Sequence, residues 1–81
     1  MKVRRISTDN KYVIPILSIQ DNLFNMEKNE KFIRLKKFCK KFIIENGYTF
    51  EFVFELERRW YPVLITNDKW LARLVMKEFC N

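Results

Sequence analysis

The chain is organised around the stretch Lys31-Phe-Ile-Arg-Leu-Lys-Lys-Phe-Cys-Lys-Lys-Phe-Ile-Ile44. When its residues are projected at about 100° each, apolar side chains gather on one side of a helix and cations on the other. The apolar side consists of Phe32, Leu35, Phe38, Cys39, Phe42 and Ile43. The cationic side consists of Arg34, Lys36, Lys37, Lys40 and Lys41. This one helix is therefore predicted to supply much of the core and the largest basic surface.

The limits of this helix follow from the residues around it. Its start lies between residues 22 and 30, where the sequence is polar and either Asp21 or Asn25 is a suitable N-cap. Its end is predicted at Asn46-Gly47, because this pair favours the left-handed conformation that terminates helices.

The next segment, Tyr48 to Glu57, alternates in the manner of a half-buried strand. One face carries Tyr48, Phe50, Phe52, Phe54 and Leu56, and the other carries Thr49, Glu51, Val53, Glu55 and Glu57. Arg58-Arg59 then predicts a tight turn, and Trp60 to Thr66 a second strand of the same hairpin. We expect the aromatic face to be core and the acidic face to be open to water.

Further segments complete the pattern. A final helix is predicted after Thr66 or Asn67 as its cap, with Asp68 in its first turn. The apolar stripe of this helix is predicted to be Trp70, Leu71, Leu74, Val75 and Phe79. Near the N-terminus, the runs 2–7 and 11–19 predict another hairpin. Pro15 has no N–H, so its strand should be an edge there, bulged, or broken.

Together these segments predict an α+β fold with the element order ββαββα. We expect a two-layer sandwich in which a four-stranded antiparallel sheet carries both helices on one face. Residues 1–81 are expected to form a single domain, and because so small a core gains from association, a homodimer is one option.

Composition limits the function. Sixteen Lys and Arg residues against ten Asp and Glu give a formal net charge of +6, which predicts attraction to polyanions such as nucleic acid or an acidic protein surface. The apolar runs are too short to span a membrane, so a cytoplasmic protein without a membrane partner is expected. Cys39 and Cys80 are predicted to be free thiols, and we expect no metal or cofactor.

The residue types do not favour catalysis. There is no histidine to act as a base and only one glycine, which excludes a glycine-rich phosphate loop. The glutamates of the predicted strand offer a Mg²⁺ site as in nucleases, but acidic residues at alternate positions are the usual solvent face of a sheet. We therefore expect a protein that is not an enzyme.

The chain resembles two groups of known proteins in part. Gly47-Tyr-Thr-Phe50 is similar to part of the RNP1 motif of the RRM family, but the predicted element order differs from that family, so the aromatic residues are interpreted as core rather than as base-stacking platforms. In size, charge and a bias toward residues with AT-rich codons, the chain resembles small accessory proteins of phages and bacteria. That resemblance implies a role in binding RNA or in disabling host toxins and nucleases, within the host cytoplasm if a phage encodes the chain.

The leading hypothesis is a non-enzymatic, regulatory or counter-defence protein that binds nucleic acid, RNA in preference to DNA, through phosphates. Its predicted contacts are Arg34, Lys36, Lys37, Lys40 and Lys41, with Arg4, Arg5, Arg58 and Arg59 as outlying candidates. The alternative is a protein-interaction module that inhibits a host enzyme, toxin or nuclease by docking on its acidic or nucleic-acid-binding surface. A solvated helix face without any partner is also left open.

Overall fold

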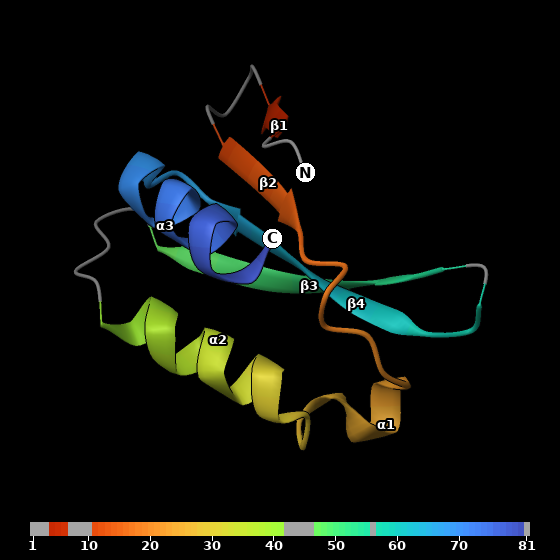
Figure 1. Ribbon diagram of the computed structural model, residues 1–81. Helices are drawn as coiled ribbons and strands as arrows, with labels where there is room; N and C mark the ends of the chain where they lie inside the picture. Colours follow the sequence, from red (N-terminus) through yellow and green to blue (C-terminus); the bar gives the residue numbers. More distant parts are fainter. Residues whose placement is uncertain (1–3, 7–10, 42–46, 56, 81) are drawn as a thin grey trace.

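The computed structural model describes residues 4–6, 11–41, 47–55 and 57–80 (Figure 1). Their elements are, in order, β1 (Arg4–Ile6), β2 (Lys11–Pro15), α1 (Leu23–Met26), α2 (Glu30–Lys40), β3 (Tyr48–Phe54), β4 (Trp60–Thr66) and α3 (Lys69–Phe79). The prediction of an α+β fold is confirmed. The predicted order ββαββα is wrong, because a short additional helix, α1, precedes the basic helix α2.

An asparagine begins each of the helices α1 and α2. The Asn22 side chain accepts a hydrogen bond from the N–H of Asn25 at 2.9 Å and begins α1. The Asn29 side chain accepts from the N–H of Phe32 at 3.1 Å and begins α2. An N-cap residue has an extended backbone, so no helix can run through Asn29. The segment 22–30, in which one helix start was predicted, therefore contains two. The predicted caps Asp21 and Asn25 start neither helix.

The end of α2 is described only in part. The helix ends at Lys40, with Lys41 as its C-cap, before the predicted stop at Asn46-Gly47, of which Asn46 lies outside the described residues. Gly47, on the far side of that gap, has a φ of +73°. This is the left-handed conformation predicted for it, in which a residue with a Cβ would be strained.

The strands pair antiparallel in the order β1-β2-β4-β3, which places β4 between β2 and β3. The β3–β4 hairpin runs in register from Tyr48 opposite Thr66 to Phe54 opposite Trp60. The described residues of β1 pair with the first three residues of β2, from Ile6 opposite Lys11 to Arg4 opposite Val13.

Pro15 marks the end of β2, which is shorter than the run predicted from the sequence. The next N–H, that of Ile16, donates to the carbonyl of Pro62 on β4 at 3.0 Å. Since alternate residues of a strand direct their N–H groups to opposite sides, the nitrogen of Pro15 faces away from β4. It points to the side of β2 on which β1 lies, beyond the last pair that the structure describes there, Arg4 with Val13.

One face of the sheet and the two long helices enclose the core. Ile14 and Leu64 are neighbours across β2 and β4, and both are fully buried. The helices add Phe32, Leu35 and Cys39 from α2 and Leu71, Ala72 and Val75 from α3. Figure 1 shows α2 and α3 as two separate coils beside the β3 and β4 ribbons.

The aromatic face of β3 is core along most of its length. The ring of Phe32 packs edge to face on Phe50 and Phe52, with centroid distances of 5.3 and 5.4 Å. At the hairpin end, Phe54 meets Trp60 edge to face with a centroid distance of 5.3 Å and is 52% exposed. The prediction of core aromatic residues is therefore confirmed for Phe50 and Phe52 and wrong for Phe54.

The opposite face of the sheet differs from the acidic face that was predicted. The register places Val13, Ile65 and Thr49 in one row and Pro15, Val63 and Glu51 in the next. The glutamates at positions 55 and 57 follow β3 in the hairpin connection. This face is thus mainly apolar, because the central strand β4 contributes apolar residues to both faces.

Candidate nucleic-acid interface

The cations of α2 are spread around the exposed side of the helix, and packing gives them different neighbours. We call Arg34, Lys37 and Lys41, which line a hollow beside α3, the first flank, and Lys36 and Lys40, which do not line it, the second flank. On the second flank, the Nζ atom of Lys36 lies 5.0 Å from the centroid of the Phe32 ring, a cation–π contact at the β3 side of the helix.

The first flank borders a hollow of about 280 Å³ between α2 and the end of α3. It is lined by Arg34, Lys37, Phe38 and Lys41 of the α2 segment and by Glu78 and Phe79 of α3. An adjoining hollow of about 170 Å³ shares three of these residues and adds Ser18, Ile19 and Lys31. We refer to these nine residues together as the basic groove.

Aromatic rings form part of the wall of the basic groove. Phe38 and Phe79, both half-buried, meet edge to face with a centroid distance of 5.4 Å. The hydroxyl of Ser18 donates a hydrogen bond to the carbonyl oxygen of Phe79 at 2.5 Å. This bond ties the last turn of α3 to the loop after β2, so three segments of the chain hold the groove in shape.

The charges of the basic groove are unequal. Its lining includes four cations, namely Lys31, Arg34, Lys37 and Lys41, and one carboxylate, that of Glu78. Among the residues that the structure describes, Arg34, Lys37 and Lys41 form no salt bridge. The carboxyl end of α3 adds a partial negative charge of about half a unit, which is too little to balance the cations. The groove is therefore suited to an anion with several charges.

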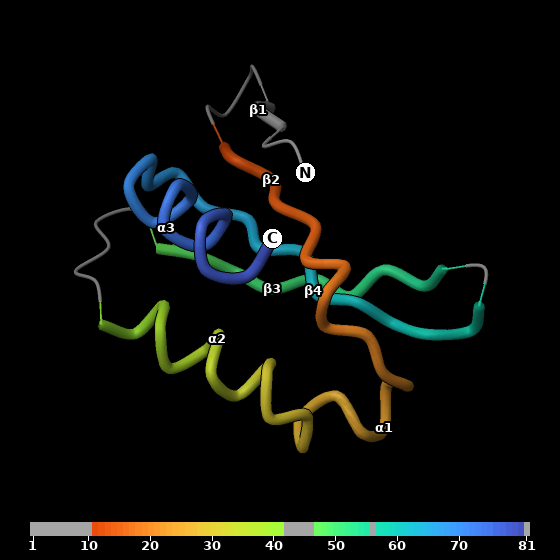
Figure 2. The backbone as a smooth tube through the Cα atoms, viewed as in Figure 1, coloured from red at the N-terminus to blue at the C-terminus, as the bar shows by residue number. Residues whose placement is uncertain are grey.

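The outlying candidates lie elsewhere. Arg58 and Arg59 are exposed in the β3–β4 connection, where Arg58 has a φ of 60° and donates its N–H to the carbonyl of Glu55 at 3.1 Å. Arg4 and Arg5 belong to β1, at the other edge of the sheet, and their side chains are outside the described part of the structure. Figure 1 shows β1 apart from α2, and Figure 2 shows the far end of the β3–β4 hairpin apart from α2. The nine predicted contacts thus do not form one surface.

Sequence reasoning missed part of the groove. Phe38 and Phe79 were interpreted only as core, and Lys31 was not considered a contact. The position of Lys31, three residues before Arg34 on the same helix flank, was an available signal. No such signal was available for the α3 part of the groove, because it depends on how the two helices pack.

The thiols show no sign of reactivity. Cys39 is completely buried, and burial raises the pKa of its thiol to about 12. Burial also raises the pKa of Cys80. Within the described ranges, no three His, Cys, Asp or Glu side chains gather as metal ligands would.

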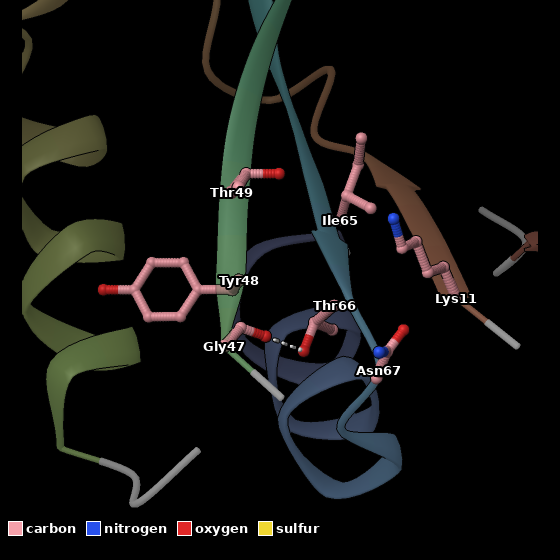
Figure 3. Close-up of a pocket in the computed structure, with 7 residues that line it drawn as sticks. All are labelled: Lys11, Gly47, Tyr48, Thr49, Ile65, Thr66 and Asn67. Carbon is pink, nitrogen blue, oxygen red and sulfur yellow. Dashed lines mark hydrogen bonds between the residues drawn. The ribbon is translucent and has the colours of Figure 1, made fainter. Parts of the chain in front are cut away.

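Another small hollow, of about 100 Å³, lies where β2 and β3 begin and β4 ends (Figure 3). Its polar groups hold the fold together: the hydroxyl of Thr66 donates to the carbonyl of Gly47 at 3.1 Å and accepts from the N–H of Asp68 at 3.0 Å. Asp68 in turn is the N-cap of α3, so the prediction of Thr66 or Asn67 as the cap was wrong. We interpret this hollow as a structural junction.

The comparisons with known proteins give no family for the chain. Neither protein-family models, nor curated proteins, nor solved structures match it. In the described part of the chain, every helix is too short or too polar to traverse a bilayer.

Proposed function

We propose that the protein binds nucleic acid through phosphates held in the basic groove, and that it does so without catalysis. The observation that carries the proposal is the charge of this groove, in which four cations and one carboxylate surround half-buried aromatic rings. Cations placed so close together repel one another, and a run of phosphates relieves that repulsion while releasing condensed counterions.

RNA is the preferred ligand over duplex DNA. The cations line a hollow between two packed helices, so this flank of α2 is not free to enter a major groove as a recognition helix does. Proteins that recognise RNA usually contact loops and single strands, which fit a hollow of this size. A regulatory or counter-defence role in the cytoplasm accords with the resemblance to small basic phage proteins.

The salt dependence of RNA binding tests this proposal. If three to four groove cations each neutralise one phosphate of a single strand, log K should fall with log[salt] with a slope of about −2 to −3. The measurement is fluorescence anisotropy of a labelled single-stranded RNA at several salt concentrations. Binding that does not depend on salt, or no binding at low salt, would contradict the proposal.

A second candidate function is inhibition of a host enzyme, toxin or nuclease by direct docking. It is favoured by α1, where Phe24 is 94% exposed and its neighbour Leu23 is 46% exposed. Exposed apolar side chains next to one another mark many protein-binding surfaces. Affinity purification with and without nuclease treatment distinguishes docking on a protein from RNA binding. A stoichiometric polypeptide that is retained after nuclease treatment and lost in Phe24→Ala supports docking. Copurified material that nuclease removes supports RNA binding.

A further inference from the structure

The outward face of α3 carries an aromatic residue that the fold does not use. Trp70 is 67% exposed, whereas its neighbour Leu71 and the more distant Val75 are fully buried. The sequence pattern placed Trp70 in the core stripe, and this prediction was wrong. At about 100° per residue, Trp70 lies on the side of α3 that also carries Arg73 and Lys77.

Two cations adjoin the indole of Trp70, whose backbone N–H is hydrogen-bonded to the Asp68 carboxylate. The guanidinium of Arg73 lies 5.4 Å from the centroid of the indole ring, in a cation–π contact. Lys69, the preceding residue, is exposed, as is Arg73 itself. An indole that stays two-thirds exposed beside a guanidinium offers a flat surface to a ligand that carries both a π system and negative charge.

We infer that Trp70 and Arg73 form a stacking site for an unpaired base, and that the ligand is therefore a single strand. The inference rests on the proposed nucleic-acid binding and specifies its ligand. Charge complementarity selects this ligand: the base stacks on the indole while its phosphates meet Lys69 and Arg73. In a duplex the bases are stacked on one another and their faces are closed to a protein ring.

The distance between the two sites suits a short strand. Trp70 and Phe79 are the second and last residues of α3, so they are about 13 Å apart along its axis, which is the advance of about four stacked nucleotides. They lie on different sides of the helix, because nine residues turn the helix by two and a half turns. A flexible single strand can cross α3 between them, and a stiff duplex cannot.

The test compares an unpaired strand with ligands that offer phosphates but no unpaired base. Labelled oligo(U) of 12 nucleotides, an abasic oligonucleotide of the same length and a duplex RNA are titrated with the full-length protein and its Trp70→Ala and Trp70→Phe variants. Trp70→Ala should weaken oligo(U) binding about 5- to 100-fold without changing the salt slope. Trp70→Phe, which keeps a ring, should retain the affinity within a few-fold, and the abasic ligand should not distinguish the variants.

Intrinsic tryptophan fluorescence gives a second readout of base stacking, which does not depend on a change in affinity. Oligo(U), but not the abasic ligand, should quench the wild-type protein, and the quenching should disappear in Trp70→Phe, where Trp60 is the only remaining indole. Equal affinity for oligo(U) and the abasic ligand, or unchanged binding by Trp70→Ala, would overturn the stacking site. If binding still depended on salt in that case, the proposed function would stand. Absence of salt-dependent binding to all three ligands would overturn both.

Discussion

Phe32 joins the helical layer to the sheet. Its ring is 3% exposed and contacts both Phe50 and Phe52. Its burial was evident from the sequence, since helical spacing placed it among apolar neighbours. The exposure of Trp70 was not evident from the sequence. The apolar stripe of α3 is wider than the surface that the sheet covers, and the sequence does not show which edge of the stripe stays exposed.

Replacing Phe32 by Ala should lower the free energy of unfolding by about 3–5 kcal/mol, through lost burial and the cavity that remains. Phe24→Ala is the matched control, because the same atoms are removed from a side chain that is 94% exposed. Urea denaturation followed by circular dichroism measures both. Similar losses in the two variants would show that Phe32 does not hold the layers together.

Cys39 should be protected from alkylation. Because burial raises the pKa of its thiol from 9.0 to about 12, the thiolate population below pH 9 should be about a thousandfold lower than for an ordinary cysteine. The unfolded chain releases this proton near pH 9 and the folded chain only near pH 12, so stability falls as the pH rises above 9.

The check is the rate of iodoacetamide labelling in a Cys80→Ser background at pH 8. Labelling as fast as that of an unfolded control would contradict a buried thiol. The fall in unfolding free energy above pH 9 should be smaller in Cys39→Ala than in the parent protein.

Among the elements, the β3–β4 hairpin was the easiest to predict and the start of α2 the hardest. The strict alternation of apolar and polar residues from Tyr48 onward predicts a strand, whichever other strand it pairs with. The segment before α2 contains several asparagines that are equally good caps, so local preference did not reveal that Asn22 and Asn29 would each begin a helix. At α3, three adjacent polar residues competed in the same way, and Asp68 is the cap.

Asp68→Ala should destabilise the protein by about 0.5–2 kcal/mol. The Asp68 carboxylate accepts hydrogen bonds from the N–H groups of Trp70 and Leu71 at 2.9 and 3.0 Å, and alanine leaves both donors without this acceptor. Asp68→Asn is the control, because its side-chain oxygen can still accept. Thermal unfolding that ranks the alanine variant equal to the asparagine variant would argue against capping as the cause.

Over the whole molecule, the net charge of +6 indicated a polyanionic partner, but the positions of the cations required the three-dimensional arrangement. The sequence placed five cations on one helix face, of which three line the hollow beside α3. Arg34, Lys37 and Lys41 come together with Lys31 around the end of α3. No local pattern could have shown this, because the α3 residues of the groove, Glu78 and Phe79, are at least 37 residues further along the chain than its α2 residues.

This division allows a matched test of the basic groove. Lys37→Ala/Lys41→Ala removes two cations from the groove, and Lys36→Ala/Lys40→Ala removes two from the other flank. Both pairs have the same spacing and both lower the net charge from +6 to +4, so an effect of overall charge is equal in the two proteins.

The most direct measurement is the salt slope of single-stranded RNA binding by these two double variants. The groove variant should lose about 1.4 from the magnitude of its slope, or about 0.7 for each phosphate contact removed, while the control variant keeps nearly the wild-type slope. Equal slopes in the two variants would contradict the claim that the groove between α2 and α3 is where the nucleic acid binds.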